Sequence, residues 1–453
     1  MDTREPAGEF YQTGSCRRLY PTCEASGVEW LGDIPAHWAL KRLRFACDIN
    51  PRKSEIAGLP PDTEVSFLPM EKIGEDGTYV LDEIRTLDQV WQGYTYFRER
   101  DVVVAKITPC FENGKGALFR GLFNGIGFGT TELHVLRANA DTCPEFVFHL
   151  TRLHLFRHLG NAMMHGTAGQ QRVPENFIKD FVAGFPSLSE QRAIAAFLDR
   201  ETARINALVA KQGRLIALLQ EKCAALISHT VTKGLDPNVP MKDSGIPSIG
   251  LIPVHWETQR NKHVFEERDE RSVAGEEELL SVSHITGVTP RSEKEVYMFM
   301  AESMEGYKLC HPGDLVINTM WAWMGALGVT EYEGIVSPSY HVYRLRKEHA
   351  SEYVPKYLDL LYRTPVYVCE ITRHSKGVWT SRLRLYPDSF FDIQTVTPPR
   401  TEQIQIVTHV SRQIQRMDEL VDKSRQFIGL LQEYRTALIS AAATGKIDVR
   451  EEV

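Results

Sequence analysis

Polar and basic side chains gather at comparable places in the two halves of the chain, each time after a short β-like run or a glycine-containing turn. The candidates in the first half are Lys106, Thr108, Asn113, Lys115, Gln170, Gln171 and Arg172. The candidates in the second half are Asn318, Thr319, Trp321, Lys376, Trp379, Thr380, Ser381, Arg382 and Arg384. Arginine and lysine suit guanine or phosphate, and glutamine and asparagine can pair bidentately with adenine. Taken singly, each is a solvated loop residue. As repeated clusters, they predict a nucleic-acid-binding surface.

Motifs that carry catalysis are missing. The sequence has no Walker A loop, HExxH, GxSxG, GxGxxG after a strand, or convincing PD…(D/E)xK nuclease pattern. The string Leu59-Pro60-Pro61-Asp62 lacks the aromatic residue that an adenine methylase stacks on a flipped base. No carboxylates are spaced for metal ligation. We therefore expect no catalytic residue, and neither a metal nor a cofactor bound by the chain.

The composition is that of a multidomain globular protein, with 453 residues, 43% of them hydrophobic and 25% charged. A formal net charge of −7 means that any nucleic-acid contact must come from local basic patches.

The eight cysteines form no CxxC pair, so reduced thiols are expected. The first residues, MDTREPAGEF, contain no apolar h-region, and no apolar run is long enough to cross a bilayer. A cytoplasmic protein is expected.

An internal repeat organises the chain. GVEWLGDIPAHW, which begins at Gly27, returns in the second half as GIPSIGLIPVHW, which begins at Gly245. Further on, Glu-Gln, LLQE and ALIS recur at one constant offset, from Glu190 to Glu402 in the first case. The repeated His-Trp pairs invite a base-stacking interpretation, but identical pairs in both copies favour packing of each domain's entrance against a scaffold. The chain is thus two copies of one unit, a variable block followed by a helix.

The repeated downstream segments carry helix signals. Ser187 to Glu190 follows Pro186 in a capping-box pattern, in which the serine hydroxyl and the glutamate satisfy free amides of the first turn, and Gly234 supplies a stop. Apolar residues in alternating steps of four and three predict a heptad seam. Its members are Ile194, Leu198, Ile205, Leu208, Leu215, Leu219, Leu226, Ile406, Val410, Met417, Leu420, Phe427, Leu431 and Leu438. A helix over 187–234 would be about 70 Å long. We expect the two helices to pair antiparallel; the alternative is that each packs on its own domain's core.

The blocks between the helices mix short strands, such as Asp101–Ile107 and Asp314–Asn318, with helices such as Glu145–Leu159 and Val354–Thr364. The expected fold class is α+β, with two mixed α/β domains separated by two long helices in an antiparallel intrachain coiled coil, and a pseudo-twofold repeat. The expected divisions are an N-terminal extension over 1–26, a first domain over 27–186, a first spacer helix over 187–234, a second domain over 235–398, a second spacer helix over 399–447 and a tail over 448–453.

From about Gly27 to Asp448 these residues resemble the specificity subunits of type I restriction-modification enzymes. The most specific strings are SGVEWLGDIPAHW, AKITPCFENGKGA, NGIGFGTTELHVLR, GDLVIN, GIVSPSYHVYRLR and the first long helix, SEQRAIAAFLDRETARINALVAKQGRLIALLQEKCAALISHTVTKG. The resemblance implies a non-catalytic subunit with two target recognition domains, each of which reads half of a bipartite double-stranded DNA site, and helices that set the unread gap.

The resemblance also implies partners. Two modification subunits would methylate adenine with S-adenosylmethionine, and two restriction subunits would move and cut DNA with ATP and Mg. Docking of the modification subunits would fall on helix residues outside the seam, such as Arg192, Arg204, Arg214 and Arg412. Two other hypotheses stay open at this point. One is a coiled-coil scaffold that binds protein without sequence-selective DNA affinity, and the other is a cryptic nuclease.

Overall fold

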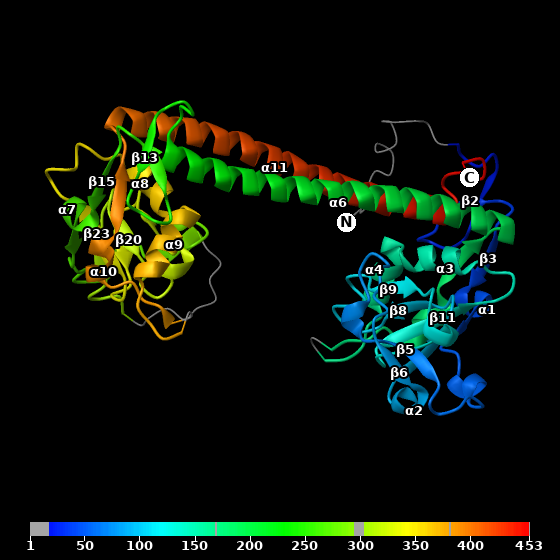
Figure 1. Ribbon diagram of the computed structural model, residues 1–453. Coiled ribbons are helices and arrows are strands. Elements are labelled where there is room, and N and C mark those ends of the chain that lie inside the picture. The colour runs from blue at the N-terminus through cyan, green and yellow to red at the C-terminus, as the bar shows by residue number, and fades with distance from the viewer. Residues whose placement is uncertain (1–17, 168–169, 294–302, 380–381, 453) are drawn as a thin grey trace. The chain divides into compact units, whose positions relative to one another are not determined.

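The computed structural model describes residues 18–167, 170–293, 303–379 and 382–452, and its contacts divide the chain into two compact units. The first unit comprises Met1–Lys211 with Gln426–Val453, and the second unit comprises Gln212–Arg425. The long helices α6 (Leu188–Lys233) and α11 (Arg400–Ala443) each contribute one stretch to either unit. Each unit therefore consists of a mixed α/β domain and two helical stretches (Figure 1).

The domain of the first unit is built from short strands and helices, and its strands β8, β9 and β11 lie together beside α3 (Figure 1). Its strands are β1 Cys23–Ala25, β2 Asp33–Pro35, β3 Ala39–Arg42, β4 Cys47–Ile49, β5 Glu64–Leu68, β6 Ile84–Thr86, β7 Thr95–Arg98, β8 Val102–Ala105, β9 Gly116–Leu118, β10 Ile126–Gly129, β11 Leu133–Ala138 and β12 Val182–Phe185. Its helices are α1 Leu43–Ala46, α2 Leu87–Val90, α3 Pro144–Thr151, α4 His154–Ala162 and α5 Glu175–Asp180. The single helix expected over Glu145–Leu159 is therefore two helices, α3 and α4, with a break at Arg152 and Leu153.

The domain of the second unit follows the same plan. Its strands are β13 Met241–Asp243, β14 Leu251–Pro253, β15 Glu257–Arg260, β16 Phe265–Arg268, β17 Leu280–Ser283, β18 Gly287–Pro290, β19 Lys308–Cys310, β20 Leu315–Ile317, β21 Leu327–Val329, β22 Gly334–Val336, β23 His341–Leu345 and β24 Gln394–Thr397. Its helices are α7 Asn261–Val264, α8 Pro355–Tyr362, α9 Pro365–His374 and α10 Pro387–Asp392.

Most sheets of the two units correspond. The order β4-β11-β8-β9 in the first unit matches β16-β23-β20-β21 in the second, and the pairs β12-β3 and β1-β2 match β24-β15 and β13-β14. The four-stranded sheet β6-β5-β10-β7 corresponds to two separate pairs, β17-β18 and β19-β22. Even a parallel contact recurs: β10 pairs parallel with β5, and Ile335 of β22 forms a parallel bridge with Leu279. The internal repeat seen in the sequence is therefore a repeat of tertiary structure.

The two long helices pack against each other in an antiparallel arrangement within each unit. In the first unit, Ile194 and Leu198 near the start of α6 share a core with Leu438 and Ala442 near the end of α11. In the second unit, the end of α6 around Val231 shares a core with the start of α11, including Ile406 and Val410. This is the predicted antiparallel intrachain coiled coil, and at its ends each stretch also packs on its own domain.

The predicted seam needs correction in its central part. Leu215, Leu420 and Phe427 are 43%, 49% and 43% exposed. The next residue along α11, Val421, is buried in place of Leu420. Both positions are apolar, so the apolar stripe is wider than the seam. An α-helix has 3.6 residues per turn, so residues seven apart drift slowly around its axis. The orientation that α11 takes where it packs on the domain core therefore decides whether Leu420 or Val421 faces inward.

The remaining predicted seam residues are more buried. Ile194, Leu198, Ile205, Ile406, Val410, Met417 and Leu438 are buried, and Leu208, Leu219, Leu226 and Leu431 are half-buried. Ser424, a polar residue that lies between Leu420 and Phe427 at the same four-and-three spacing, is also buried. The two ends of the stripe thus carry most of the apolar burial, where the helices also meet the domain cores.

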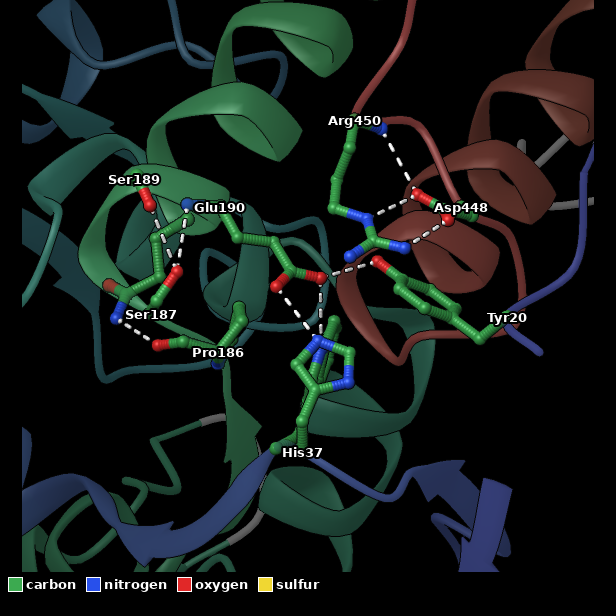
Figure 2. Close-up of polar contacts among 10 residues, drawn as sticks. Tyr20, His37, Pro186, Ser187, Ser189, Glu190, Asp448 and Arg450 are labelled. Carbon is green, nitrogen blue, oxygen red and sulfur yellow. Dashed lines mark hydrogen bonds and ion pairs between the residues drawn. The ribbon is translucent and has the colours of Figure 1, made fainter. Parts of the chain in front are cut away.

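A glutamate in the first turn of α6 fastens the helix to the domain of the first unit (Figure 2). Glu190 accepts hydrogen bonds from the Trp38 indole at 3.1 Å and the Tyr20 hydroxyl at 2.8 Å, and its other oxygen lies 2.9 Å from Nε2 of His37. In the second unit, Glu402 lies 3.0 Å from the indole nitrogen of Trp256 and 2.8 Å from Nε2 of His255. The interpretation that the repeated His-Trp pairs pack each domain on the scaffold is confirmed.

The capping-box prediction is half right. The Ser187 hydroxyl accepts a hydrogen bond from the Glu190 amide at 3.3 Å, as expected. The Glu190 side chain does not cap, because it bonds Tyr20 and Trp38 instead. Burial, together with the bond to the Glu190 carboxylate, raises the pKa of Tyr20 well above its ordinary value, so the hydroxyl stays a donor.

The glutamine that follows each of these glutamates makes a second repeated contact. Gln191 accepts a hydrogen bond from the Cys143 amide at 2.9 Å and donates to the Pro186 carbonyl at 2.9 Å. Gln403 does the same with the Val354 amide and the Pro398 carbonyl, both at 2.8 Å. The repeated Glu-Gln pair therefore ties the His-Trp segment and the start of α3 or α8 to the start of the long helix in one joint.

Both ends of the described chain lie in the first unit. Residues 18–26 join its fold, because β1 pairs with β2 and Tyr20 is buried. The C-terminal residues also pack there, since Val449 is buried and the Asp448 amide donates to the Arg18 carbonyl at 2.8 Å. Within the described residues, no helix combines the length and apolar character needed to cross a membrane.

Candidate nucleic-acid interface

A buried aspartate at the start of one central strand anchors the framework of each candidate surface. Asp101 receives two hydrogen bonds from the Arg137 guanidinium, at 2.8 and 2.7 Å. Asp314 receives the same pair from Arg344, both at 2.8 Å. Bidentate guanidinium–carboxylate pairs are geometrically strict. The first pair therefore fixes β8 against β11, and the second fixes β20 against β23. Each pair also orients the loop that follows β8 or β20.

In the first unit the structure brings together two clusters that lie far apart in the sequence. The Thr108 amide donates to the Gln171 carbonyl at 3.0 Å, and the Gln171 amide donates to the Thr108 hydroxyl at 3.1 Å. The Val173 amide reaches the Lys106 carbonyl at 2.8 Å. The loop around 106–115 and the segment 170–173 thus form one surface.

Not every candidate side chain on this surface is free. Arg172 donates two hydrogen bonds to Glu132, at 2.8 and 2.9 Å, and this pairing lowers the pKa of Glu132. The ammonium group of Lys115 donates to the Met70 carbonyl at 3.2 Å. Asn113 and Gln170 are exposed. Arg172 is exposed but paired with Glu132, so the other exposed candidates on this surface are amides.

In the second unit, two candidates have a structural role instead. Asn318 and Thr319 are buried. The Asn318 amide donates to the Tyr340 hydroxyl at 2.9 Å, and the Thr319 hydroxyl donates to the Ser339 carbonyl. These bonds tie the end of β20 to the segment that enters β23, so neither side chain can reach a ligand unless that turn opens. The sequence pattern placed them correctly at a strand end but could not show which way they point.

The exposed candidates of the second unit are aromatic and basic. Trp321 is 50% exposed and stacks on Trp323, with ring centroids 6.3 Å apart and planes at 15°. Trp379 is 69% exposed at the tip of a turn whose flanks, Lys376 and Arg384, pair through backbone bonds of 2.9 and 3.0 Å. Arg382 and Arg384, in the same segment, are exposed. Thr380 and Ser381 lie outside the described residues.

Helix α9 connects the two loops of the second unit. The Thr372 hydroxyl in α9 donates to the Trp323 carbonyl at 3.1 Å, and α9 ends at His374, directly before the Lys376 turn. Met320 and Met324, next to Trp321 and Trp323 in sequence, and Val378, next to Trp379, are also exposed apolar residues. Sequence reasoning missed these three and Trp323. The signal for them was the density of large apolar residues in the loop strings TMWAWM and GVW.

The described residues contain no cluster of three or more histidine, cysteine, aspartate or glutamate side chains that could hold a metal ion. The seven described cysteines are free. The arrangement of each surface is suited to hydrogen bonding and stacking with a ligand.

Part of the sequence is similar to that of known proteins. No protein-family model matches the chain. Two type I restriction enzyme specificity subunits from Escherichia coli, EcoAI and EcoEI, are 39% and 35% identical to it over 189 residues. The match covers 41% of this chain and 31% of each relative. The chain therefore spans about a third of the length of these relatives.

Solved structures match over a larger part of the chain. A chain from a type I restriction-modification system, solved to explain complex assembly and conformational transition, has a TM-score of 0.67 at 19% identity and covers 90% of this chain and 98% of its own length. The HsdS subunit from Thermoanaerobacter tengcongensis has a TM-score of 0.55 at 18% identity, with coverages of 91% and 98%. At these identities the likeness shows the fold. In sequence over 189 residues and in fold over about nine-tenths of its length, the chain is similar to the specificity subunits of type I restriction-modification systems.

Proposed function

We propose that the chain is the non-catalytic DNA-specificity subunit of a type I restriction-modification complex, in which each unit reads one half of a bipartite site. One observation carries the proposal. The two units share a framework down to individual side chains, in the Asp101–Arg137 and Asp314–Arg344 pairs, yet present chemically different loops on it. A repeated framework with different exposed loops is what two specificities on one scaffold require.

In the first unit, hydrogen bonding is the proposed basis of recognition. Asn113, Gln170 and Gln171 offer amides that suit adenine edges, and Thr108 and Lys106 lie beside them on the paired loops. Arg172 is held by Glu132 in the free chain. On DNA, Arg172 would exchange the Glu132 carboxylate for guanine or phosphate, so its contact with DNA would form only on binding.

In the second unit, stacking and apolar contact are the proposed basis. Trp321 and Trp379 present aromatic faces, which can stack on bases or contact thymine methyl groups. Lys376, Arg382 and Arg384 supply positive charge around Trp379 for the phosphate backbone. The two units would therefore recognise their half-sites by different chemistry.

The long helices have two proposed roles. Helix α6 contains 46 residues and is therefore about 69 Å long, and we propose that the pair sets the length of the unread gap. Arg192, Arg204, Arg214 and Arg412 are exposed on the helices and are the proposed docking points for two modification subunits. Those subunits would use S-adenosylmethionine, and two restriction subunits would use ATP and Mg.

The experiment that tests this function compares methylated adenines in the native genome with and without the gene for this chain. The expected result is loss of methylation at one bipartite motif. Purified chain, mixed with the modification subunits, should bind a duplex that carries the motif more tightly than a scrambled duplex. Unchanged methylation together with equal binding of both duplexes would favour a protein-binding scaffold without sequence-selective DNA affinity.

A further inference from the structure

Three arginines of the first unit form a cluster outside the loops discussed above. Arg152 follows α3, Arg157 lies in α4, and Arg435 lies in α11. The sequence analysis did not single them out, because they are far apart along the chain and each looks like an ordinary helix residue. The fold brings a domain helix, a loop and a long helix together around them.

Backbone and amide oxygens hold the cluster in place. Arg152 donates to the Gly114 carbonyl at 2.8 Å and also to the Glu75 carbonyl. Arg157 packs on Gly114 so closely that a Cβ there would lie 2.9 Å from its Nη1. Arg435 donates to the Asn206 side-chain oxygen at 2.7 Å. The Nε atom of Arg157 is buried and has no hydrogen-bond partner within the described part of the chain.

The electrostatics of the cluster are unfavourable in the free chain. Among the described residues, no ion pair neutralises any of the three guanidinium groups. Burial, and then repulsion by Arg157 and Arg435, lower the pKa of Arg152 to about 10, although Asp76 and Glu75 oppose this shift. Burial and then Arg435 also lower the pKa of Arg157. Like charges held together without a direct ion pair favour the binding of an anion.

The second unit provides an internal comparison, because the repeat assigns each position a counterpart. Arg152 corresponds to Arg363, whose Nη1 lies 3.8 Å from a carboxylate oxygen of Asp359. Arg157 corresponds to Val368, Arg435 to Cys223 and Asn206 to Asp418. Burial and then Asp418 raise the pKa of Cys223, so that thiol is neutral. Of the three cations in the first unit, the second unit therefore keeps one, and it adds the carboxylates of Asp359 and Asp418 nearby. The common fold does not require the cluster.

We infer that Arg152, Arg157 and Arg435 form a binding site for a phosphate of the DNA backbone. The inference rests on the proposed function and extends it. Gly114 touches both Arg152 and Arg157 and lies between Asn113 and Lys115, in the first unit's own candidate DNA-binding loop. A phosphate at this position would lie beside the bases that this loop reads. Guanidinium groups bind phosphate through paired hydrogen bonds, and the orphaned Nε of Arg157 supplies a further donor.

The test replaces two arginines with the second unit's own residues, in the double variant Arg157→Val, Arg435→Cys. Arg157→Lys retains the charge, and Arg52→Ala removes an exposed arginine elsewhere in the first unit. Circular dichroism establishes that each chain is folded. Binding to target and scrambled duplexes is then measured against salt concentration, with the modification subunits present.

The double variant should lose about tenfold in affinity for both duplexes, with a salt dependence weaker by about one unit in the slope of log K against log salt. The ratio of target to scrambled affinity should stay constant, because a phosphate contact carries no base information. Arg157→Lys should lose less affinity than the double variant, and Arg52→Ala should bind as tightly as the wild type. A second arm uses inorganic phosphate alone. It should raise the unfolding temperature of the wild type more than that of the double variant, relative to chloride at equal ionic strength.

Each of the following outcomes would overturn the inference. An unchanged salt slope combined with a selective phosphate effect would mean that the anion comes from an acidic partner surface. An unchanged slope without a phosphate effect would mean that no anion site exists. If the wild type distinguishes the two duplexes while the double variant equals it, only this inference fails. If the wild type does not distinguish them, the proposed function fails as well.

Discussion

The two units agree where the domain meets the helices and differ where a ligand would approach. Trp38 and Trp256 donate to glutamates at the starts of the two long helices, at 3.1 and 3.0 Å. Beyond that joint, the first unit presents amides and a three-arginine cluster, and the second presents exposed tryptophans beside lysine and arginine. The comparison separates what the repeat needs in order to fold from what each unit is free to vary.

The units also differ in which parts of the chain make the contact between the end of a long helix and the segment before β2 or β14. In the second unit, Lys233 donates to the Ile249 carbonyl at 2.8 Å, over a short continuous stretch. In the first unit, Lys446 donates to the Leu31 carbonyl at 3.0 Å, between opposite ends of the sequence. The ion pair between Arg18 and Glu451 closes the same region. One contact is thus made twice, once by neighbours in sequence and once by the two ends of the described chain.

The largest expected effect comes from the framework that the units share. Arg137→Ala leaves the buried Asp101 without its charge partner, and Arg344→Ala does the same to Asp314. Removing one partner of a buried pair costs about 3–5 kcal/mol of stability. Hydrogen exchange should report loss of protection in the first unit for Arg137→Ala and in the second unit for Arg344→Ala. Loss of protection in both units from either change would show that the units are not independent folding units.

Acid should destabilise the first unit through Glu145. Burial alone would raise its pKa, but hydrogen bonds from Cys143 and Arg120 outweigh burial and lower that pKa from 4.5 to about 2. A lowered folded-state pKa stabilises the fold above pH 4.5, and this contribution is lost as the pH falls from 4.5 toward 2. Glu145→Gln should cost about 2 kcal/mol at pH 7 and flatten that part of the acid curve. In the second unit Lys356 stands at the corresponding position and pairs with Glu331, so that unit has no counterpart of the Glu145 carboxylate. A wild-type acid limb retained in Glu145→Gln would contradict the assignment.

The contrast between amide and aromatic loops can be measured directly. Trp379→Ala should weaken binding by about 1–2 kcal/mol, because base stacking on an exposed aromatic is lost. Discrimination against changed bases should fall in the second unit's half-site only. The matched change in the first unit, Gln170→Ala, should reduce discrimination in the other half-site. Equal effects of Trp379→Ala on both halves would contradict separate reading.

The smallest expected effect distinguishes the two candidate seams on α11. Val421→Ala removes buried methyl groups and should cost about 1–2 kcal/mol, whereas Leu420→Ala removes a half-exposed side chain and should cost under about 1 kcal/mol. Denaturant unfolding of both variants measures the difference. The reverse order would restore the seam expected from the heptad pattern.

Much of the architecture could be predicted from the sequence because the repeat carries it. The constant offset between the repeated strings, from Glu190 to Glu402, placed both long helices, and the heptad stripe predicted that they pair. The stop at Gly234 is confirmed by its left-handed conformation, with φ at 82°. These features depend on local propensity and periodicity, which the sequence states directly.

The candidate surface was predicted less completely, because the direction of a side chain is a tertiary property. Asn318 and Asn113 are the same residue type after comparable strands, yet the first is buried on Tyr340 and the second is exposed. The cluster of Arg152, Arg157 and Arg435 joins residues from distant parts of the sequence. Only the packing of α4, α11 and the Gly114 loop brings them together.

The most direct test of the account exchanges residues 27–186 for the first domain of another specificity subunit and maps methylated adenines in cells that express the hybrid with its modification subunits. We expect a methylated motif in which the half-site read by the first unit is replaced and the other half-site and the gap are retained. A motif altered in both halves would contradict the claim that each unit reads its own half of the DNA.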